Sequence, residues 1–337
     1  MVVEMMPEPR GSGFRSSTLS WKSRTTAYTF DAAARDNIAV YFGQTNLTGT
    51  TSLSAQCANA NIDIVILAFV TEFDASTQKY PTVNFGAACG GTTNAMALSA
   101  PGLLYCPLIA ANITECQKRG KKVFLSLGGT TGRFSLPTSH DAETLGDNLW
   151  TLFGPPGNID HELRPFGDVT LDGFDFNIES GNGKNFKCLG ARLREKFGSD
   201  PSRQYYLSAA PQCPFPDRST PMDLVNLADF VWVQFYNNPP CQIGSDGFHS
   251  SLRQWSSELP VGSRLYLGAP GYEAASPDTY NTAISSPSNM QGIMRDVISL
   301  NLPNIGGLMF WDGPESLANS EGGGKSIVDY GKAGMRA

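Results

Sequence analysis

The sequence lacks several features that would place the protein in other classes. No apolar run reaches the roughly 18 residues that a membrane-spanning helix needs, so we expect no contact with a membrane. The net charge of −6 excludes a basic surface for nucleic acid, and a neutral partner fits better than a phosphate-rich one. The three histidines, His140, His161 and His249, lack metal-ligand spacing, and no Cys-x-x-Cys pair is present. We therefore expect no metal.

Two further absences narrow the possible chemistry. No glycine-rich phosphate loop follows the first apolar run, which argues against an open nucleotide-binding sheet. No G-x-S-x-G sequence occurs, so the nucleophile elbow of a serine hydrolase is missing. We expect an enzyme that works without a cofactor.

Residues 1–35 carry no recognisable secretory signal, and the Ser, Thr and Arg content of residues 11–35 predicts a disordered leader. A misplaced gene start, a cloning remnant and a genuine cytosolic terminus would all explain such a leader. Seven cysteines and two glycosylation triplets, Asn46-Leu-Thr48 and Asn112-Ile-Thr114, favour a secreted protein instead.

Residues 36–337 read as a single α/β domain. Short apolar runs alternate with segments of helical character, such as Leu108–Arg119 and Met290–Leu300. The runs are Asn37–Phe42, Ile62–Phe69, Lys122–Leu127, Val169–Ile178, Gln204–Ala209, Phe230–Phe235, Arg264–Gly268 and Gly307–Trp311. Eight such strand–helix units predict a closed (β/α)8 barrel, whose chemistry lies at the carboxyl ends of the strands. An open doubly wound sheet is the alternative.

The segment Leu171-Asp-Gly-Phe-Asp-Phe-Asn-Ile-Glu179 alternates polar and apolar side chains from Phe174 onward. Side chains alternate along a strand, so Asp175, Asn177 and Glu179 share the face opposite Phe174, Phe176 and Ile178. Two carboxyl groups inside a barrel cost several kcal/mol unless they are paired or hydrated. Crowded carboxyl groups also raise one another's pKa, which suits one of them to act as an acid. The pattern indicates an active site, with a structural acid cluster as the alternative.

The same segment resembles the D-G-x-D-x-D-x-E signature of family 18 glycoside hydrolases. Five other motifs, in the right order, resemble the hevamine-like class III chitinases of plants and fungi. These motifs are Ala39–Gln44, Ser126–Gly129, Ala209–Asp217, Val231–Cys241 and Gly306–Trp311. The resemblance implies a (β/α)8 barrel that cuts β-1,4-linked N-acetylglucosamine polymers by a retaining, substrate-assisted mechanism.

The resemblance also implies roles for individual residues. Glu179 matches the general acid, and Tyr236 matches the residue that aligns the substrate acetamide. Asp175 would steer its neighbours, whereas Asp172 would be a structural anchor at the start of the strand. We expect sugar contacts from six further residues, namely Tyr41, Gln44, Ser126, Gln234, Asn237 and Trp311, with the Trp311 indole under the sugar. Ser126 is equally compatible with a bond inside the barrel or a contact with Asp175.

Asn177 is the main departure from the family pattern, which has an aspartate at this position. An amide can accept a hydrogen bond but carries no negative charge to balance a developing cation. Losing that charge could cost about 2–4 kcal/mol, or roughly 10²–10³ in rate. An engineered substitution, a naturally slow enzyme and a binder without catalysis would each explain Asn177.

For the cysteines the resemblance implies the disulfides Cys57–Cys116, Cys89–Cys106 and Cys213–Cys241, and leaves Cys188 as a buried free thiol. The alternative is a cytosolic protein with all seven reduced.

We predict a monomeric endo-acting chitinase with chitin or its oligosaccharides as partner. A chitin-binding lectin or decoy is the second hypothesis, and an endo-β-N-acetylglucosaminidase acting on N-glycans is a weaker third.

Overall fold

The computed structural model describes residues 28–45, 52–181 and 183–337. Its eight main strands are β1 (Asn37–Phe42), β2 (Ile64–Asp74), β4 (Lys122–Gly129), β6 (Gly173–Ile178), β7 (Tyr206–Ala209), β8 (Phe230–Gln234), β9 (Arg264–Pro270) and β10 (Ile305–Trp311). The principal helices are α1 (Leu53–Ala58), α2 (Asn94–Ser99), α3 (Pro107–Lys118), α4 (Ser139–Phe153), α5 (Phe186–Gly198), α6 (Met222–Val225), α7 (Phe248–Glu258), α9 (Asn289–Ser299), α10 (Gly313–Ala318) and α11 (Ile327–Met335). Within these ranges no helix is long and apolar enough to cross a membrane.

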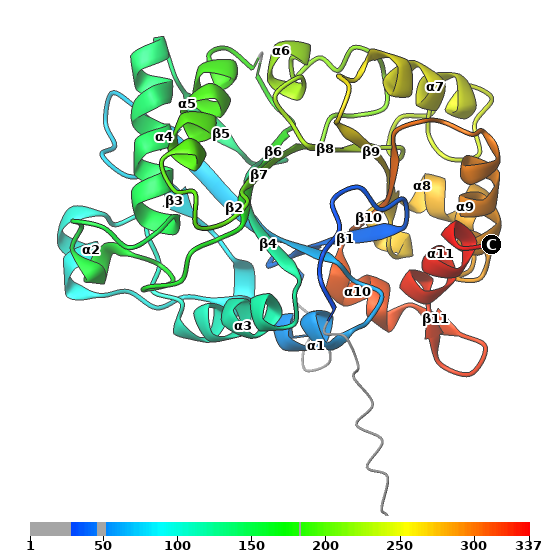
Figure 1. Cartoon of the computed structure of the whole chain (residues 1–337), viewed down its shortest axis with the longest axis horizontal. Helices are drawn as coiled ribbons and strands as arrows, with labels where there is room; N and C mark the ends of the chain where they lie inside the picture. The colour runs from blue at the N-terminus through cyan, green and yellow to red at the C-terminus, as the bar shows by residue number, and fades with distance from the viewer. Residues whose placement is uncertain (1–27, 46–51, 182) are drawn as a thin grey trace, which may run out of the picture.

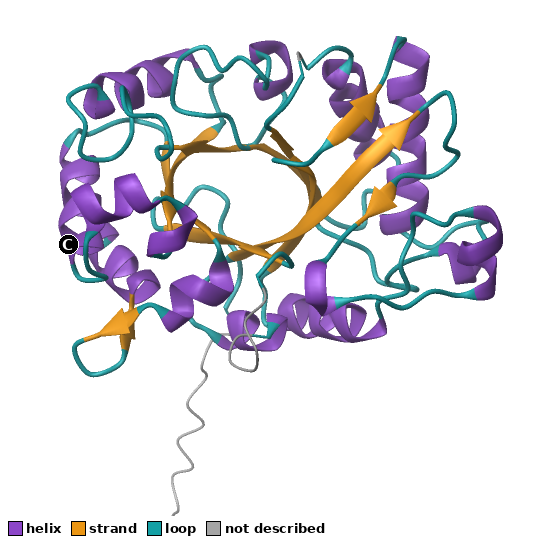
Figure 2. Ribbon diagram, turned by 180° about the vertical axis from the view of Figure 1, so that it is seen from behind, coloured by secondary structure: helices purple, strands orange, loops and turns teal. Residues whose placement is uncertain are grey.

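The eight strands form a closed parallel barrel. Each pairs in parallel with the next along the order β1-β2-β4-β6-β7-β8-β9-β10, and β10 pairs with β1 to close the ring. Figure 1 looks into the ring, and Figure 2 shows from behind how helices and loops surround it. The (β/α)8 barrel predicted from the sequence is therefore confirmed, and the open sheet is excluded.

Each of the eight predicted apolar runs overlaps a barrel strand. Strands β4, β9 and β10 extend two residues beyond their runs, and β2 extends furthest. It continues past Phe69 to Asp74, where β3 (Thr82–Val83) pairs antiparallel and β5 (Arg133–Ser135) pairs parallel with it. Neither short strand was predicted, because two or three residues give no detectable alternation. This extension forms a wall above one side of the barrel mouth.

The amino end of the barrel is covered by residues that we had assigned to the leader. Phe30 packs its ring edge-on against Tyr206 and Phe230, with ring centroids 5.8 and 6.0 Å apart. The hydroxyl of Tyr28 donates to Asp63 at 2.6 Å. The packed unit thus begins by Tyr28 rather than at Asp36, whereas residues 1–27 lie outside the described residues.

The three expected disulfides are confirmed. Cys57–Cys116 joins α1 to α3, Cys89–Cys106 closes the loop before α3, and Cys213–Cys241 joins the segments after β7 and β8. Cys188 on α5 is unpaired, but it is partly exposed rather than buried. Of the two glycosylation triplets, Asn112 lies on α3, and Asn46 falls outside the described residues.

A buried ion pair joins the last helix to the amino ends of β1 and β2. The Lys332 ammonium on α11 donates to the Asp63 carboxylate at 3.0 Å, and both residues are less than 5% exposed. The same carboxylate accepts from the backbone N–H of Ile38 at 2.7 Å and from Tyr28. Lys332 also donates to the Asp36 carbonyl. Asp63 thus connects β1, the segment before it and the last helix.

Lys332→Met should destabilise the fold by about 3–5 kcal/mol, because it leaves the Asp63 carboxylate buried without its cation. The matched control is Arg336→Met, directly after the end of the same helix. Arg336 pairs with Asp36, but its side chain is 61% exposed, so its loss should cost less than about 1 kcal/mol. Urea unfolding of both variants measures the difference. Equal losses would contradict the role given to the Asp63–Lys332 pair.

Candidate active site

The acidic strand lies as its alternation predicts. Phe174, Phe176 and Ile178 belong to the core between strands and helices. Asp175 and Asn177 lie on the opposite face and are almost fully buried, and Glu179 follows the end of β6 with partial exposure. The backbones are close here, because a Cβ on Gly128 of β4 would lie 2.0 Å from the Asn177 carbonyl oxygen. Only glycine fits at position 128, where φ is also +116°.

The Asp175 carboxylate is at the centre of a hydrogen-bond network inside the barrel. One oxygen accepts from the hydroxyls of Tyr41 at 2.8 Å and Ser126 at 2.6 Å. The other accepts from Ser208 at 2.7 Å and from the Trp232 indole N–H at 2.8 Å. Burial raises the pKa of Asp175, and these four donors act in the opposite direction. The carboxyl group is held firmly but has no solvent access.

Asn177 lies between the buried acid and the strand end. Its side-chain oxygen accepts from the Gln234 amide at 3.0 Å, and Gln234 also donates to the Ala210 carbonyl at 3.0 Å. The side-chain amides of Asn177 and Gln234 also favour the charged form of Glu179. Without substrate, the Asn177 oxygen is therefore already used by Gln234.

Glu179 is the acid nearest to solvent on this strand. Burial raises the pKa of Glu179, and the negative charge of Asp217 adds to that rise, while the side-chain amides of Asn177 and Gln234 oppose it. Tyr236, directly after β8, is 6% exposed, and burial together with the charge of Glu179 keeps its pKa well above the usual value. A carboxyl group that is easily protonated and a neutral phenol thus face the same space.

An aromatic cluster closes another side of this space. The Trp311 ring, at the end of β10, lies 5.4 Å from Tyr41 and stacks on Phe69 at 5.8 Å with an interplanar angle of 18°. Trp311 is partly exposed, whereas Tyr41 and Phe69 are buried. Trp311 is consequently the member of the cluster that can offer an aromatic face to a ligand.

Several residues expected to touch a sugar are placed differently. Tyr41 and Ser126 are buried, and their hydroxyls donate to Asp175. They therefore fix Asp175 inside the barrel and have no hydroxyl hydrogen left to donate to a sugar. The Gln44 amide donates to the backbone carbonyls of Ala68 and Asn84, each at 2.9 Å. Asn237 is exposed beyond Tyr236 in a left-handed conformation with φ of 56°, so its contact with a sugar stays a prediction.

Asp172 lies at the other end of the barrel. Its carboxylate accepts from the Val123 N–H at 3.0 Å and the Gln117 amide at 2.9 Å, and it pairs with Lys122 at 3.4 Å. These contacts join α3, β4 and the start of β6, away from Glu179.

Sequence reasoning gave no role to three residues of the site. Trp232 has the same parity as Gln234 along β8, and this alternation could have revealed its inward direction. Ser208 and Phe69 gave no such signal, because neither residue type is unusual at those positions. The β6–β7 register places Ser208 beside Asp175, and Phe69 reaches the site by stacking on Trp311.

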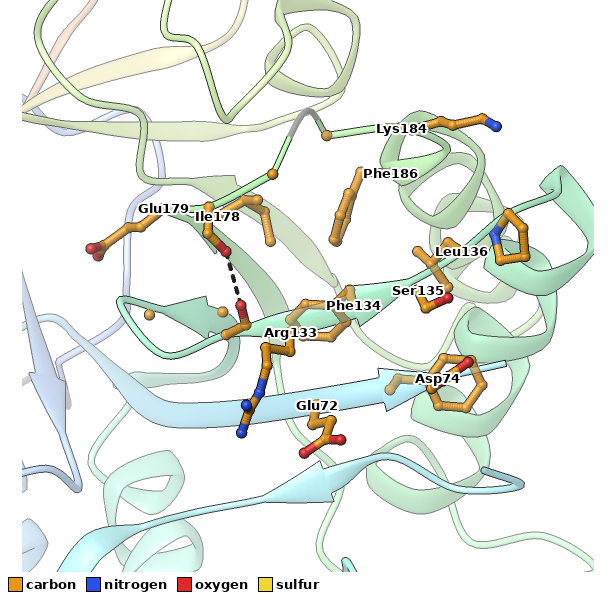
Figure 3. Close-up of a pocket in the computed structure, with 18 residues that line it drawn as sticks. Glu72, Asp74, Arg133, Phe134, Ser135, Leu136, Ile178, Glu179, Lys184 and Phe186 are labelled. Carbon is orange, nitrogen blue, oxygen red and sulfur yellow. Dashed lines mark hydrogen bonds between the residues drawn. The ribbon is translucent and has the colours of Figure 1, made fainter. Parts of the chain in front are cut away.

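A cavity of 540 Å³ opens beside Glu179 (Figure 3). Its walls come from the extension of β2, from β5 and from the loop after β6, and include Glu72, Arg133 and Phe186. In Figure 3 the Glu179 carboxyl points away from the rings of Phe134 and Phe186. Tyr236 and Trp311 do not line the cavity, so it adjoins the site on the side of β2 and β5.

Within the described ranges, no group of three or more His, Cys, Asp or Glu side chains could hold a metal ion. The side chains at the site are suited to proton transfer by Glu179, hydrogen bonding by Tyr236 and the amides, and stacking on Trp311.

The chain is similar to known proteins over most of its length. A family model described as glycosyl hydrolases family 18 matches residues 37–291. Endochitinase 3 of Metarhizium anisopliae is 36% identical over 292 residues, which cover 86% of this chain and 96% of that protein. The crystal structure of the ICChI chitinase from Ipomoea carnea superposes with a TM-score of 0.72 at 32% identity, covering 88% of this chain and 99% of that one.

A solved structure with another function is also similar. The xylanase and α-amylase inhibitor protein XAIP-II from Scadoxus multiflorus has a TM-score of 0.68 and 29% identity, with 84% of this chain and 95% of that chain covered.

Asp175→Asn should destabilise the protein by about 2–3 kcal/mol. Its amide nitrogen would face donors, and the Trp232 indole N–H cannot rotate to become an acceptor. Ser208→Ala removes one donor and leaves the carboxylate, so it should cost about 1 kcal/mol. Chemical unfolding measures both free energies. A stability of Asp175→Asn equal to the parent would show that the four donors do not favour the carboxylate.

Proposed function

Because this chain belongs to the glycosyl hydrolases of family 18, we propose that it is an endo-acting chitinase that cleaves β-1,4 bonds between N-acetylglucosamine residues with retention of configuration. The observation that carries the proposal is the arrangement of Glu179 beside Tyr236, above a buried carboxylate and near the partly exposed indole of Trp311. This arrangement offers an acid, an acetamide partner and a sugar platform in one space.

In the proposed mechanism Glu179 protonates the glycosidic oxygen as the bond to the anomeric carbon breaks. Its buried surroundings favour the protonated form that this step needs. The carbonyl oxygen of the substrate's own acetamide attacks the anomeric carbon and forms an oxazolinium ion, so no enzyme nucleophile is required. Glu179, now ionised, accepts a proton from the water that opens this intermediate from the same face.

The other residues position the sugar. The Tyr236 hydroxyl would donate to the acetamide carbonyl, and Trp311 would stack beneath the pyranose ring. Asn177 would accept from the acetamide N–H, which requires its oxygen to leave Gln234 or to accept both donors. Because Asn177 is neutral, we expect slow formation of the cationic intermediate.

The second candidate is a chitin-binding protein without useful catalysis. It is favoured by Asn177 and by the similarity to an inhibitor protein of the same fold. In either case, the three disulfides support a secreted protein. We propose that it acts as a monomer.

Asn177→Asp should raise kcat on a soluble N-acetylglucosamine oligomer by roughly 10²–10³, because it restores a charge next to the developing cation. Product analysis after incubation measures turnover in both proteins. Glu179→Gln, which keeps the shape but cannot donate a proton, is the matched control and should abolish cleavage in both backgrounds.

Two outcomes would decide against the enzyme. Tight oligomer binding without turnover in the parent and in Asn177→Asp would favour the binding protein. Turnover that survives Glu179→Gln would remove Glu179 from the proposed role.

The pH dependence follows from the raised pKa of Glu179. The acid must be protonated, so kcat/KM should fall as pH rises through that pKa, at a higher pH than an exposed glutamate would give. In Asn177→Asp the added negative charge should raise the pKa of Glu179 further and move this limb to higher pH. A pH profile of the two proteins measures the shift, and a limb that moves to lower pH would contradict the assignment.

A further inference from the structure

Another buried carboxyl group lies directly after Trp311. Asp312 is 1% exposed and begins α10, where its side chain accepts from the Glu315 N–H at 3.2 Å. Its other carboxyl oxygen accepts from the Thr45 hydroxyl, three residues beyond the end of β1. The residue next to the sugar platform is thus joined to a different strand end.

The segment that carries Thr45 is also fixed on its other side. The Gln44 amide donates to the carbonyls of Ala68 and Asn84. Gly43 lies so close to β2 that a Cβ on it would be 2.5 Å from the Ala68 carbonyl oxygen, and its φ is +126°. Residues 43–45 therefore bridge β2 and the end of β10.

The three strands joined in this way carry the aromatic cluster. Tyr41 lies on β1, Phe69 follows Ala68 on β2, and Trp311 ends β10. Their rings are 5.4 to 6.1 Å apart. A shift of residues 43–45 relative to Asp312 would change how Trp311 presents its face, because Phe69 stacks on that ring.

We propose that Asp312 is a positioning residue for this site, which clamps residues 43–45 to the end of β10 and thereby fixes the Tyr41–Phe69–Trp311 cluster. Asp312 itself touches no sugar in this proposal. The inference rests on the proposed function, because its consequence is the affinity for an N-acetylglucosamine oligomer.

We expect the hold of Asp312 on residues 43–45 to depend on pH, because Asp312 can ionise in the neutral range. Burial raises the pKa of Asp312 to about 7, and the nearby negative charge of Glu315 adds to the effect. The groups that face it are Thr45 after β1, Glu315 on α10 and Tyr272 in the loop after β9, whose own pKa is raised by burial and by both carboxylates. Helix α1, beside α10, carries no titratable side chain except the disulfide-bonded Cys57.

Ionisation of Asp312 opposes folding, because its surroundings raise its pKa. A folded-state pKa above the ordinary value of 3.8 means that folding favours protonated Asp312. This contribution is complete below pH 3.8 and is lost as pH rises toward 7. Above about pH 7 Asp312 is ionised, and burial opposes this charge more than the two donors favour it. Local opening that hydrates the carboxylate should therefore become easier there, and the clamp should loosen.

The test compares the parent with Asp312→Asn at pH 6 and pH 8. The protonated fraction of a group with a pKa of about 7 falls about tenfold over this interval. We expect oligomer affinity, measured by titration calorimetry on proteins that also carry Glu179→Gln to prevent turnover, to weaken up to about tenfold in the parent. Amide hydrogen exchange of residues 40–45, measured without ligand, should accelerate in parallel.

Asp312→Asn should abolish both pH effects. Its oxygen can still cap α10, its amide can donate to the Thr45 hydroxyl, and it cannot ionise. Thr45→Val removes the hydroxyl and should weaken affinity at both pH values. Asp141→Asn, at the exposed amino end of α4, is the control and should behave like the parent.

The outcomes separate this inference from the proposed function. Oligomer binding with no pH effect on affinity or exchange, or a pH effect that persists in Asp312→Asn, would overturn the clamp and leave the function intact. Exchange that responds as described, in a protein that binds no oligomer, would support the clamp as a structural device and overturn the proposed function.

Discussion

The structure depends on one buried carboxylate that is satisfied from four directions. Asp175 accepts hydrogen bonds from β1, β4, β7 and β8, and these donors can meet only if the barrel is closed and its strands are correctly staggered. Ser126 and Ser208 lie beside Asp175 in the strand register, while Tyr41 and Trp232 reach it from strands not paired with β6. A carboxyl group placed there without these donors would strongly destabilise the fold, so the interior network and the barrel geometry specify each other.

The same strand changes character from the barrel centre to its mouth. Asp175 is fully enclosed, Asn177 exchanges hydrogen bonds with its neighbours, and Glu179 reaches a partly open space. Solvent access increases from Asp175 to Glu179. Side chains on one face of the strand therefore have different roles: Asp175 is structural, Asn177 connects its neighbours, and Glu179 can exchange a proton. Asn177 keeps the hydrogen-bonding geometry of this series but removes a charge from its middle, and the proposed reaction needs a charge most at that position.

Asp175 and Asp312 show how the partners of a buried acid decide what it does. Four donors surround Asp175, and its carboxyl group is fully buried. Asp312 has the Thr45 hydroxyl and one backbone N–H, with Glu315 nearby and a pKa of about 7. The first carboxyl group is therefore a fixed part of the interior. The second can change its charge in the neutral range, at the point where the aromatic cluster meets the loop after β1.

The sequence by itself determined the elements that depend on neighbouring residues. The eight strands, α3 and α9, and the shared face of residues 175, 177 and 179 follow from local periodicity, and the disulfide pairs followed from the family resemblance. Only the tertiary structure decided that Ser126 and Tyr41 hold Asp175, that Gln44 binds backbone carbonyls, that residues 28–35 cover the barrel, and that Asp312 meets Thr45. The alternation of polar and apolar residues along a strand predicts which face each side chain occupies. Which side chains of distant strands share a layer depends on the stagger and closure of the barrel, and no local pattern carries that information.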